Sequence, residues 1–168
     1  SSIQSISGII YWHNKLRPEE RHLLTQIFRF FTQADIEVNN CYMKHYTQVF
    51  KPTEVQMMLA AFSNIETVHI AAYSYLLDTI GMPETEYEAF LHYKEMKDKY
   101  DYMQGFNCES KKDIAKTLAV FAGFTEGLQL FASFAILLNF PRHNKMKGMG
   151  QIISWSVRDE SLHCESMI

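Results

Sequence analysis

The sequence predicts an all-α protein, in which four core helices form a bundle and a fifth, more polar helix lies outside it. Apolar residues recur at helical spacing through most of the 168 residues, and no segment alternates apolar and polar residues as a strand would. The hydrophobic fraction of 47% is that of a packed domain. Single carboxylates also interrupt the apolar helix faces. We expect residues 1–13 to form an N-terminal arm and residues 14–168 one domain.

Composition argues against several classes of protein. The formal net charge of −3 offers no basic surface for nucleic acid, and no run of about 18 uninterrupted apolar residues predicts a membrane span. The opening residues SSIQSISGII lack the basic start of a secretory signal. The three cysteines, Cys41, Cys108 and Cys164, form no Cys-x-x-Cys motif, so we expect reduced thiols in a cytoplasmic protein.

The first two core helices have clear start and stop signals. The first is predicted to start at Pro18, because a proline followed by two acids suits the first turn of a helix, and to run to Phe50. The second follows at once, with Thr53 as a candidate cap, and is predicted to end at Gly81.

The remaining helices differ in polarity. Residues 83–103 are rich in charge and predict the solvent-facing outer helix. Ser110 or Asn107 is expected to cap the next helix, which is apolar nearly all round and should end at Pro141. After a short basic stretch, the last helix is predicted over residues 151–168.

One pattern of polar residues occurs twice on these apolar helices: a lone acid on one helix, then a Glu-x-x-His motif on the next. Residues three apart share a helix face, so each motif presents a carboxylate and an imidazole in one direction. An antiparallel bundle would turn all of these groups inward at one level. In chain order the two sets are Asp35, Glu66 and His69, then Glu126, Glu160 and His163.

Four inward carboxylates and two imidazoles are the ligand set of the dinuclear metal site in ferritin-like bundles. The carboxylates would carry a charge of about −4, which is costly to bury alone and which two divalent ions would neutralise. This oxygen-rich set suits iron or manganese better than structural zinc. Taken singly, a Glu-x-x-His motif is usually a solvated or core-satisfied pair, and a lone buried acid usually pairs with arginine. The two matched sets together favour the metal site.

Tyr73 extends the expected chemistry from metal binding to oxidation. It lies one turn beyond His69 on the same face, so its phenol can approach the metal pair. Leu130 and Phe134 follow Glu126 at four-residue steps and could exclude water from the pocket. The alternative is a core tyrosine that is hydrogen-bonded to a carboxylate.

At these residues the chain closely resembles the small (beta) subunit of class I ribonucleotide reductase. The resemblance covers residues 14–168 and is most specific in TQADIEVNNCY, ETVHIAAYSYLLDTIG, FTEGLQLFASFA and WSVRDESLHCES. It implies two metal ions with glutamates bridging them. The ligands it implies are Asp35, Glu66 and His69 for one ion, and Glu126, Glu160 and His163 for the other.

The resemblance also implies roles for two further residues: Tyr73 bears a radical, and Asp159 hydrogen-bonds His69 on the radical-transfer route. The metal pair would be di-iron, with manganese–iron or dimanganese also accommodated, and would use dioxygen to oxidise Tyr73. A large (alpha) subunit would then reduce ribonucleotides to deoxyribonucleotides with that oxidising equivalent. The family further suggests a homodimer.

Two departures from the family pattern concern the ends of the chain. Trp12 lies too close to Asp35 to match the family's upstream tryptophan, and the tail that docks on the large subunit has no counterpart after His163. A fragment, one piece of a split subunit or a shortened paralogue would each explain this. Two other functions stay open: a stand-alone di-metal oxidase, and a ferritin-like metal-binding protein without redox output.

Overall fold

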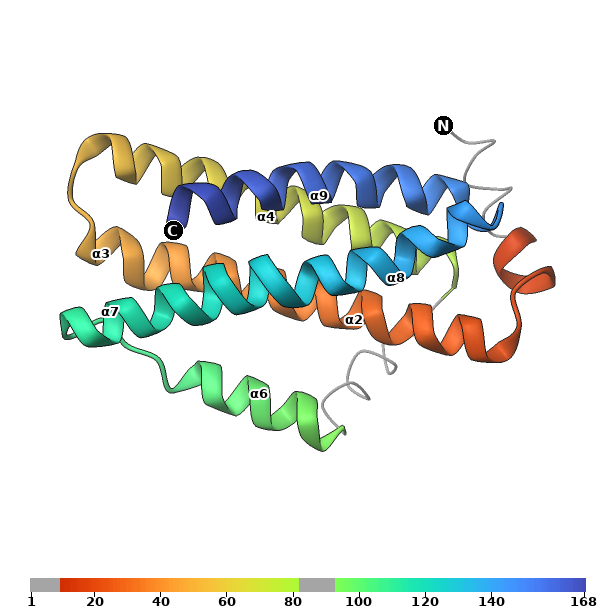
Figure 1. Ribbon diagram of the computed structural model, residues 1–168, viewed down its shortest axis with the longest axis horizontal. Helices are drawn as coiled ribbons and strands as arrows, with labels where there is room; N and C mark the ends of the chain where they lie inside the picture. The colour runs from red at the N-terminus through yellow and green to blue at the C-terminus, as the bar shows by residue number, and fades with distance from the viewer. Residues whose placement is uncertain (1–9, 82–92) are drawn as a thin grey trace.

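The computed structural model describes residues 10–81 and 93–168, and those ranges contain helices and no strand. Four long helical segments lie side by side along the longest axis of the molecule, and a shorter helix lies outside them (Figure 1). Each long segment contacts two others, so that the four close into a bundle. The predicted all-α bundle with an additional outer helix is confirmed.

The first core helix consists of α2 (Pro18–Asn40), a π-helical segment η1 (Cys41–Tyr46) and a last turn α3 (Thr47–Val49). Its predicted start is confirmed, since the proline occupies the first turn. The backbone N–H of Arg17 also donates a hydrogen bond to Glu20 Oε2 at 2.9 Å. The sequence indicated one continuous helix here, and the π-helical segment is an addition that its apolar spacing did not predict.

The second core helix, α4 (Thr53–Thr79), begins directly after the extended residue Pro52. The prediction that Thr53 caps this helix is wrong, because Thr53 is already its first helical residue and no side-chain cap is present. The predicted end is confirmed. Gly81 has a φ of 74°, a left-handed conformation that glycine adopts without steric cost, and the helix stops there.

The third core segment runs unbroken through α7 (Lys111–Leu118), the π-helix η3 (Ala119–Leu130) and α8 (Phe131–Arg142). Of the two predicted caps, Ser110 is the one used: its hydroxyl accepts the backbone N–H three residues ahead. The prediction that Pro141 ends the segment is wrong by one residue. Pro141 lies inside the last turn of α8, which continues to Arg142 although proline lacks an N–H and has a fixed φ.

The fourth core helix, α9 (Lys147–Met167), starts at Lys147 instead of residue 151. Its first turns pass very close to the end of α8. A Cβ atom added at Gly150 would overlap Cγ of Pro141, so only glycine permits this approach.

The outer helix is α6 (Lys94–Gln104), which packs against α2. Lys99 Nζ lies 4.5 Å from the centroid of the Phe30 ring, and the side-chain amide of Gln104 donates to Glu37 Oε2 at 2.9 Å. Residues 82–92, the first part of the predicted outer helix, lie outside the described residues.

One helix in the described part of the chain, Lys111–Arg142, is long and apolar enough to cross a membrane by length and composition. Its mean hydropathy is 1.5, and 39% of the apolar stretch is buried. This helix packs along α9 and carries Glu126 into the centre of the bundle. Its place as a core helix accounts for its apolar composition.

Two apolar clusters fill the bundle, one toward each end. On α2 the change from one cluster to the other falls between Ala34 and Val38. On α4 it falls between Phe62 and Tyr73, and on η3 the first cluster begins again at Leu130. The predicted metal ligands of these three helices occupy the gap, so they form a polar layer between two apolar ones.

The N-terminal boundary of the domain stays a prediction. Residues 10–14 are helical, and Trp12, which the predicted boundary assigns to the arm, is buried among the apolar residues of the bundle together with Leu16. Residues 1–9 lie outside the described part of the chain.

We predict that Gly150→Ala lowers the free energy of unfolding by about 1–3 kcal/mol, because the new methyl group must displace the rigid Pro141 ring. The matched control is Gly148→Ala on the same helix, where an added Cβ meets nothing within 4 Å. The free energy of unfolding of Gly148→Ala should be unchanged or higher by up to about 1 kcal/mol. Urea denaturation measures both, and equal effects of the two substitutions would contradict the close packing.

Candidate metal centre

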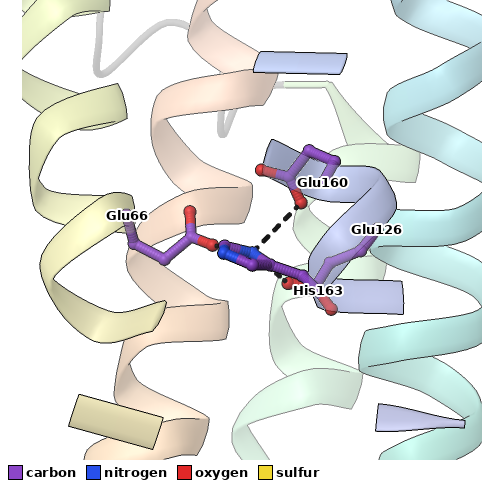
Figure 2. Close-up of side chains that lie close together, drawn as sticks. All are labelled: Glu66, Glu126, Glu160 and His163. Carbon is purple, nitrogen blue, oxygen red and sulfur yellow. Dashed lines mark ion pairs between the residues drawn. The ribbon is translucent and has the colours of Figure 1, made fainter. Parts of the chain in front are cut away.

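Six ionisable side chains from all four core helices converge in the polar layer, and none is more than 5% exposed. Every residue that the sequence predicted as a metal ligand is among them. Figure 2 shows four of them, whose functional groups point toward one another. The six are Asp35 from α2, Glu66 and His69 from α4, Glu126 from η3, and Glu160 and His163 from α9.

The six side chains form two overlapping groups, each of which could hold a metal ion. In the first, Glu66, Glu126, Glu160 and His163 offer ligand atoms that all lie within 4.8 Å of one another. The second group consists of Asp35, His69 and again Glu66. Glu66 is therefore common to both groups, as a bridging carboxylate would be.

Distances around the two imidazoles show that a second glutamate is shared as well. Nδ1 of His163 lies 2.9 Å from Glu66 Oε1 and 3.6 Å from Glu160 Oε2 (Figure 2). Nδ1 of His69 lies 3.2 Å from Glu160 Oε1 and 3.6 Å from Glu66 Oε2. Each histidine thus lies close to one oxygen of Glu66 and to one oxygen of Glu160. The two carboxylates therefore lie between the two imidazole rings.

Despite these short distances, most ligand atoms of the cluster lack a hydrogen-bond partner among the described residues. The close N···O pairs do not have the angles of hydrogen bonds, because the atoms face a common space. Buried polar atoms without a partner are costly, and cations in that space would satisfy those that face it, including Nδ1 but not Nε2 of His163. The atoms are Asp35 Oδ2, both oxygens of Glu66, Glu126 Oε2, Glu160 Oε2, His69 Nδ1 and both ring nitrogens of His163.

The protonation of the metal-free cluster follows from burial and from its crowded charges. Burial, and then the charge of Glu66, raises the pKa of Asp35 well above its usual range. Burial likewise raises the pKa of Glu126 to about 7, although the His163 imidazole opposes this. For His69, burial lowers the pKa, but the carboxylates of Glu160 and Glu66 outweigh it and raise the pKa to about 11. Protons therefore occupy the cluster when cations do not.

Two divalent ions fit this donor set. They would replace the protons on the imidazoles and acids and would balance four carboxylate charges. The set is rich in oxygen, contains two imidazoles and has no thiolate, since no cysteine belongs to either group. Such donors suit iron and manganese better than a structural zinc site. The three cysteines are free thiols, as expected.

Asp159 lies behind His69, on the side away from the cluster. Its Oδ2 is 3.2 Å from His69 Nε2, and its Oδ1 accepts two hydrogen bonds from Arg158 at 2.9 and 3.0 Å. A carboxylate in this place favours the neutral imidazole tautomer that carries its proton on Nε2, which leaves Nδ1 free to face the cluster as a ligand atom. Asp159 is partly exposed and therefore connects the buried cluster with the surface.

Two aromatic contacts at the cluster were not predicted from the sequence. The phenol of Tyr42 donates a hydrogen bond to Glu126 Oε1 at 2.6 Å, and the Phe62 ring lies 4.3 Å from the ring of His163. Tyr42 stands two helical turns after Asp35 on the same face, a spacing that could have revealed it. Phe62 stands one turn before Glu66 and carries no comparable signal, because phenylalanine at that spacing is ordinary core.

Tyr73 is buried in an apolar pocket beside the cluster. Its ring centroid lies 5.2 Å from that of Phe31, which in turn lies 5.1 Å from that of Phe134. Leu130 is buried in the same apolar group, so both residues expected to exclude water are present there. The hydrogen-bond partner of the phenol is the Ser156 hydroxyl, at 2.7 Å, and not a carboxylate. Burial, and then the charge of Asp35, raises the pKa of Tyr73 well above its usual value.

Both π-helical segments coincide with this centre. Glu126 lies within η3, and Tyr42, its hydrogen-bond partner, lies within η1. An α-helix that widens locally re-aims its side chains, and such segments are frequent at functional sites. The widened turns therefore help to direct these two side chains toward each other.

The chain matches known proteins along nearly its whole length. A family model described as ribonucleotide reductase, small chain, matches residues 7–168. A probable ribonucleoside-diphosphate reductase small subunit of Invertebrate iridescent virus 6 is 50% identical over 94% of this chain and 48% of its own length. The ribonucleoside-diphosphate reductase subunit beta of Chlamydia pneumoniae is 26% identical over 89% of this chain and 47% of its own.

A solved structure agrees with the fold. The putative class I ribonucleotide reductase from Bacillus halodurans superposes with a TM-score of 0.82 at 20% identity, covering 95% of this chain and 59% of that one. The chain thus spans about half the length of the curated relatives that it matches.

Proposed function

The chain belongs to the ribonucleotide reductase small-chain family, and on that premise we propose that its polar cluster binds two metal ions and serves to oxidise Tyr73. The observation that carries this proposal is the set of buried, partnerless carboxylate and imidazole atoms around one common space. The oxidising equivalent on Tyr73 would pass to a large subunit, which would reduce ribonucleotides to deoxyribonucleotides.

The two overlapping groups support a ligand assignment in which Glu66 and Glu160 bridge the ions. When bound, a pair of redox-active ions would activate dioxygen as the oxidant. Di-iron is the pair that we favour. Manganese–iron or dimanganese would use the same donors. Asp35 and His69 would complete one coordination sphere, and Glu126 and His163 would complete the other.

The remaining residues of the site would control protons and water. Phe31 and Phe134 keep solvent away from the phenol, so that oxidised Tyr73 would persist in a dry pocket. Asp159 lies within hydrogen-bond distance of the outer nitrogen of His69. It would link the buried site to the surface, along the path that an electron would take between the large subunit and Tyr73. The free thiols are compatible with a cytoplasmic location.

The outer face of α4 supports a homodimer as the assembled form. Val68 and Tyr75 are 59% and 64% exposed, and the small residues Ala60, Ala61 and Ala71 share that exposed face. Small side chains let two helices approach closely, and an exposed apolar face of this kind usually marks an interface. A second copy of the chain would bury it by a symmetric contact.

We predict that the metal-free protein takes up two Mn²⁺ ions per chain and unfolds at a higher temperature when they are bound. At a free concentration 100 times Kd, each site contributes about 2.7 kcal/mol. Glu66→Ala should lower the stoichiometry below two, because both groups share this residue. Glu37→Ala, which removes a buried acid outside the cluster, should leave it at two. Titration followed by elemental analysis decides, and an unchanged stoichiometry in Glu66→Ala would refute the assignment.

We predict that Fe²⁺ and dioxygen generate a narrow organic-radical signal in electron paramagnetic resonance, and that Tyr73→Phe abolishes it. Tyr42→Phe is the matched control, since it removes the other phenol at the cluster. Loss of the signal in Tyr42→Phe with retention in Tyr73→Phe would move the radical to Tyr42.

Two further results would support the other functions. Metal loading without any radical would leave a metal-binding protein. Oxidation of an added small substrate without a large subunit would indicate a stand-alone oxidase.

For the dimer, we predict that Val68→Glu produces a monomer in sedimentation velocity, because the new charge would be buried without a partner. The matched control is Leu128→Glu on η3, at an equally exposed apolar position of 58%. A wild-type protein that sediments as a monomer, or dissociation by Leu128→Glu alone, would contradict this interface.

A further inference from the structure

Ser156 supplies the hydrogen bond that the structure shows to the phenol of Tyr73. The two oxygen atoms lie 2.7 Å apart, and each side chain is 2% exposed. Tyr73 comes from α4 and Ser156 from α9, so the bond joins the two helices that carry the Glu-x-x-His motifs. Nothing in the sequence pattern singled out this serine, which stands among apolar residues on a core helix.

Either oxygen of this pair could donate, and a second contact of Ser156 favours the phenol as the donor. Ser156 Oγ also lies 3.3 Å from the backbone carbonyl of Ile152, one turn earlier. A carbonyl can only accept, so a serine proton directed to Ile152 leaves Ser156 Oγ to accept the phenol proton. The bond to Ile152 is longer than usual and therefore weak, whereas the bond to the phenol is short.

Oxidation of Tyr73 would reverse this arrangement. The phenol O–H bond would break, and its electron and proton would go to dioxygen. Reduction of one dioxygen to two waters takes four electrons and four protons. Two bound Fe²⁺ ions would each supply one electron, Tyr73 one and excess Fe²⁺ in solution the fourth, while the other three protons would come from solvent. The neutral phenoxyl oxygen has no proton left, so it can only accept a hydrogen bond. No bond within Ser156 forms or breaks.

Resting on the function proposed above, we propose that Ser156 is a positioning residue whose hydroxyl reverses its hydrogen bond with Tyr73. It accepts from the phenol in the reduced protein and rotates away from the Ile152 carbonyl to donate to the phenoxyl oxygen after oxidation. The reversal needs only rotation about the Cβ–Oγ bond, which a serine hydroxyl performs within its own space.

Ser156 is the one hydrogen-bond partner that the described residues give to the phenol, which makes its hydroxyl important. The rings of Phe31 and Phe134 and the side chain of Leu130 offer no polar hydrogen to the phenoxyl oxygen. A buried oxygen without any partner is unfavourable, so the serine would hold the radical in one orientation. A donated hydrogen bond also withdraws electron density from the phenoxyl oxygen, which lowers the largest g value of a tyrosyl radical.

High-field electron paramagnetic resonance with deuterium double resonance tests the proposal, after the metal-loaded protein has been exchanged into D₂O and oxidised. The wild-type radical should show one strongly coupled exchangeable deuteron and a lowered largest g value. Ser156→Ala should lose that coupling and shift the g value upward, while Ser156→Thr, which keeps the hydroxyl, should restore both. Ser154→Ala is the matched control. It removes a serine that likewise bonds the carbonyl four residues back, without reaching Tyr73, and it should leave the spectrum unchanged.

The outcomes separate this proposal from the function on which it rests. A wild-type radical without a coupled exchangeable deuteron overturns the role of Ser156 and leaves the oxidation of Tyr73 intact. The same holds if Ser156→Ala keeps the deuteron, because a water or another residue must then donate it. Absence of any radical in the wild type overturns both proposals. The wild-type measurement decides even if Ser156→Ala fails to fold.

Discussion

Burial of four carboxylates and two imidazoles at one level of the bundle is the constraint on which the rest of the structure depends. No stable protein leaves such a cluster without compensation, since each uncompensated buried charge costs several kcal/mol. The apolar clusters above and below it keep the level dry and so strengthen every interaction within it. Protons can compensate the charge in part, but they leave the ligand atoms of Glu66 and His163 without partners. Cations satisfy charge and geometry together.

The two halves of the cluster are related in sequence but not in their surroundings. His69 has a carboxylate, Asp159, behind its outer nitrogen, whereas Nε2 of His163 has no hydrogen-bond partner among the described residues. His163 instead packs against the ring of Phe62. Among the described residues, His69 alone of the two histidines therefore has a carboxylate on its outer nitrogen, and Tyr73 lies one turn from His69. The two halves of the cluster therefore differ in their link to the surface: His69 has a partly exposed carboxylate behind it and His163 has an aromatic ring.

The sequence predicted those features that depend on local spacing. Helical periodicity identified the core helices, and the repeated pattern of lone acid and Glu-x-x-His located all six residues of the cluster, although their role as ligands stays a prediction. It failed where tertiary contacts decide. Pro141 lies within α8 and α9 begins at Lys147, and the two helices meet where Gly150 contacts Pro141. Ser156 could not be found, because the partner of a serine on an apolar face is visible only once the helices are packed.

The contact between Ser156 and Tyr73 connects the pocket of Tyr73 with the carboxylate–imidazole cluster through one pair of helices. Tyr73 follows His69 by one turn on α4, and Ser156 precedes Glu160 by one turn on α9. On each of the two helices, the turn that carries the hydroxyl group is therefore next to the turn that carries the predicted ligands. Any ion held between Glu66 and Glu160 fixes the distance between α4 and α9 at the cluster, and a rigid helix carries that distance one turn further. Binding of an ion at the cluster and the hydrogen bond to the phenol would thus depend on the same helix spacing.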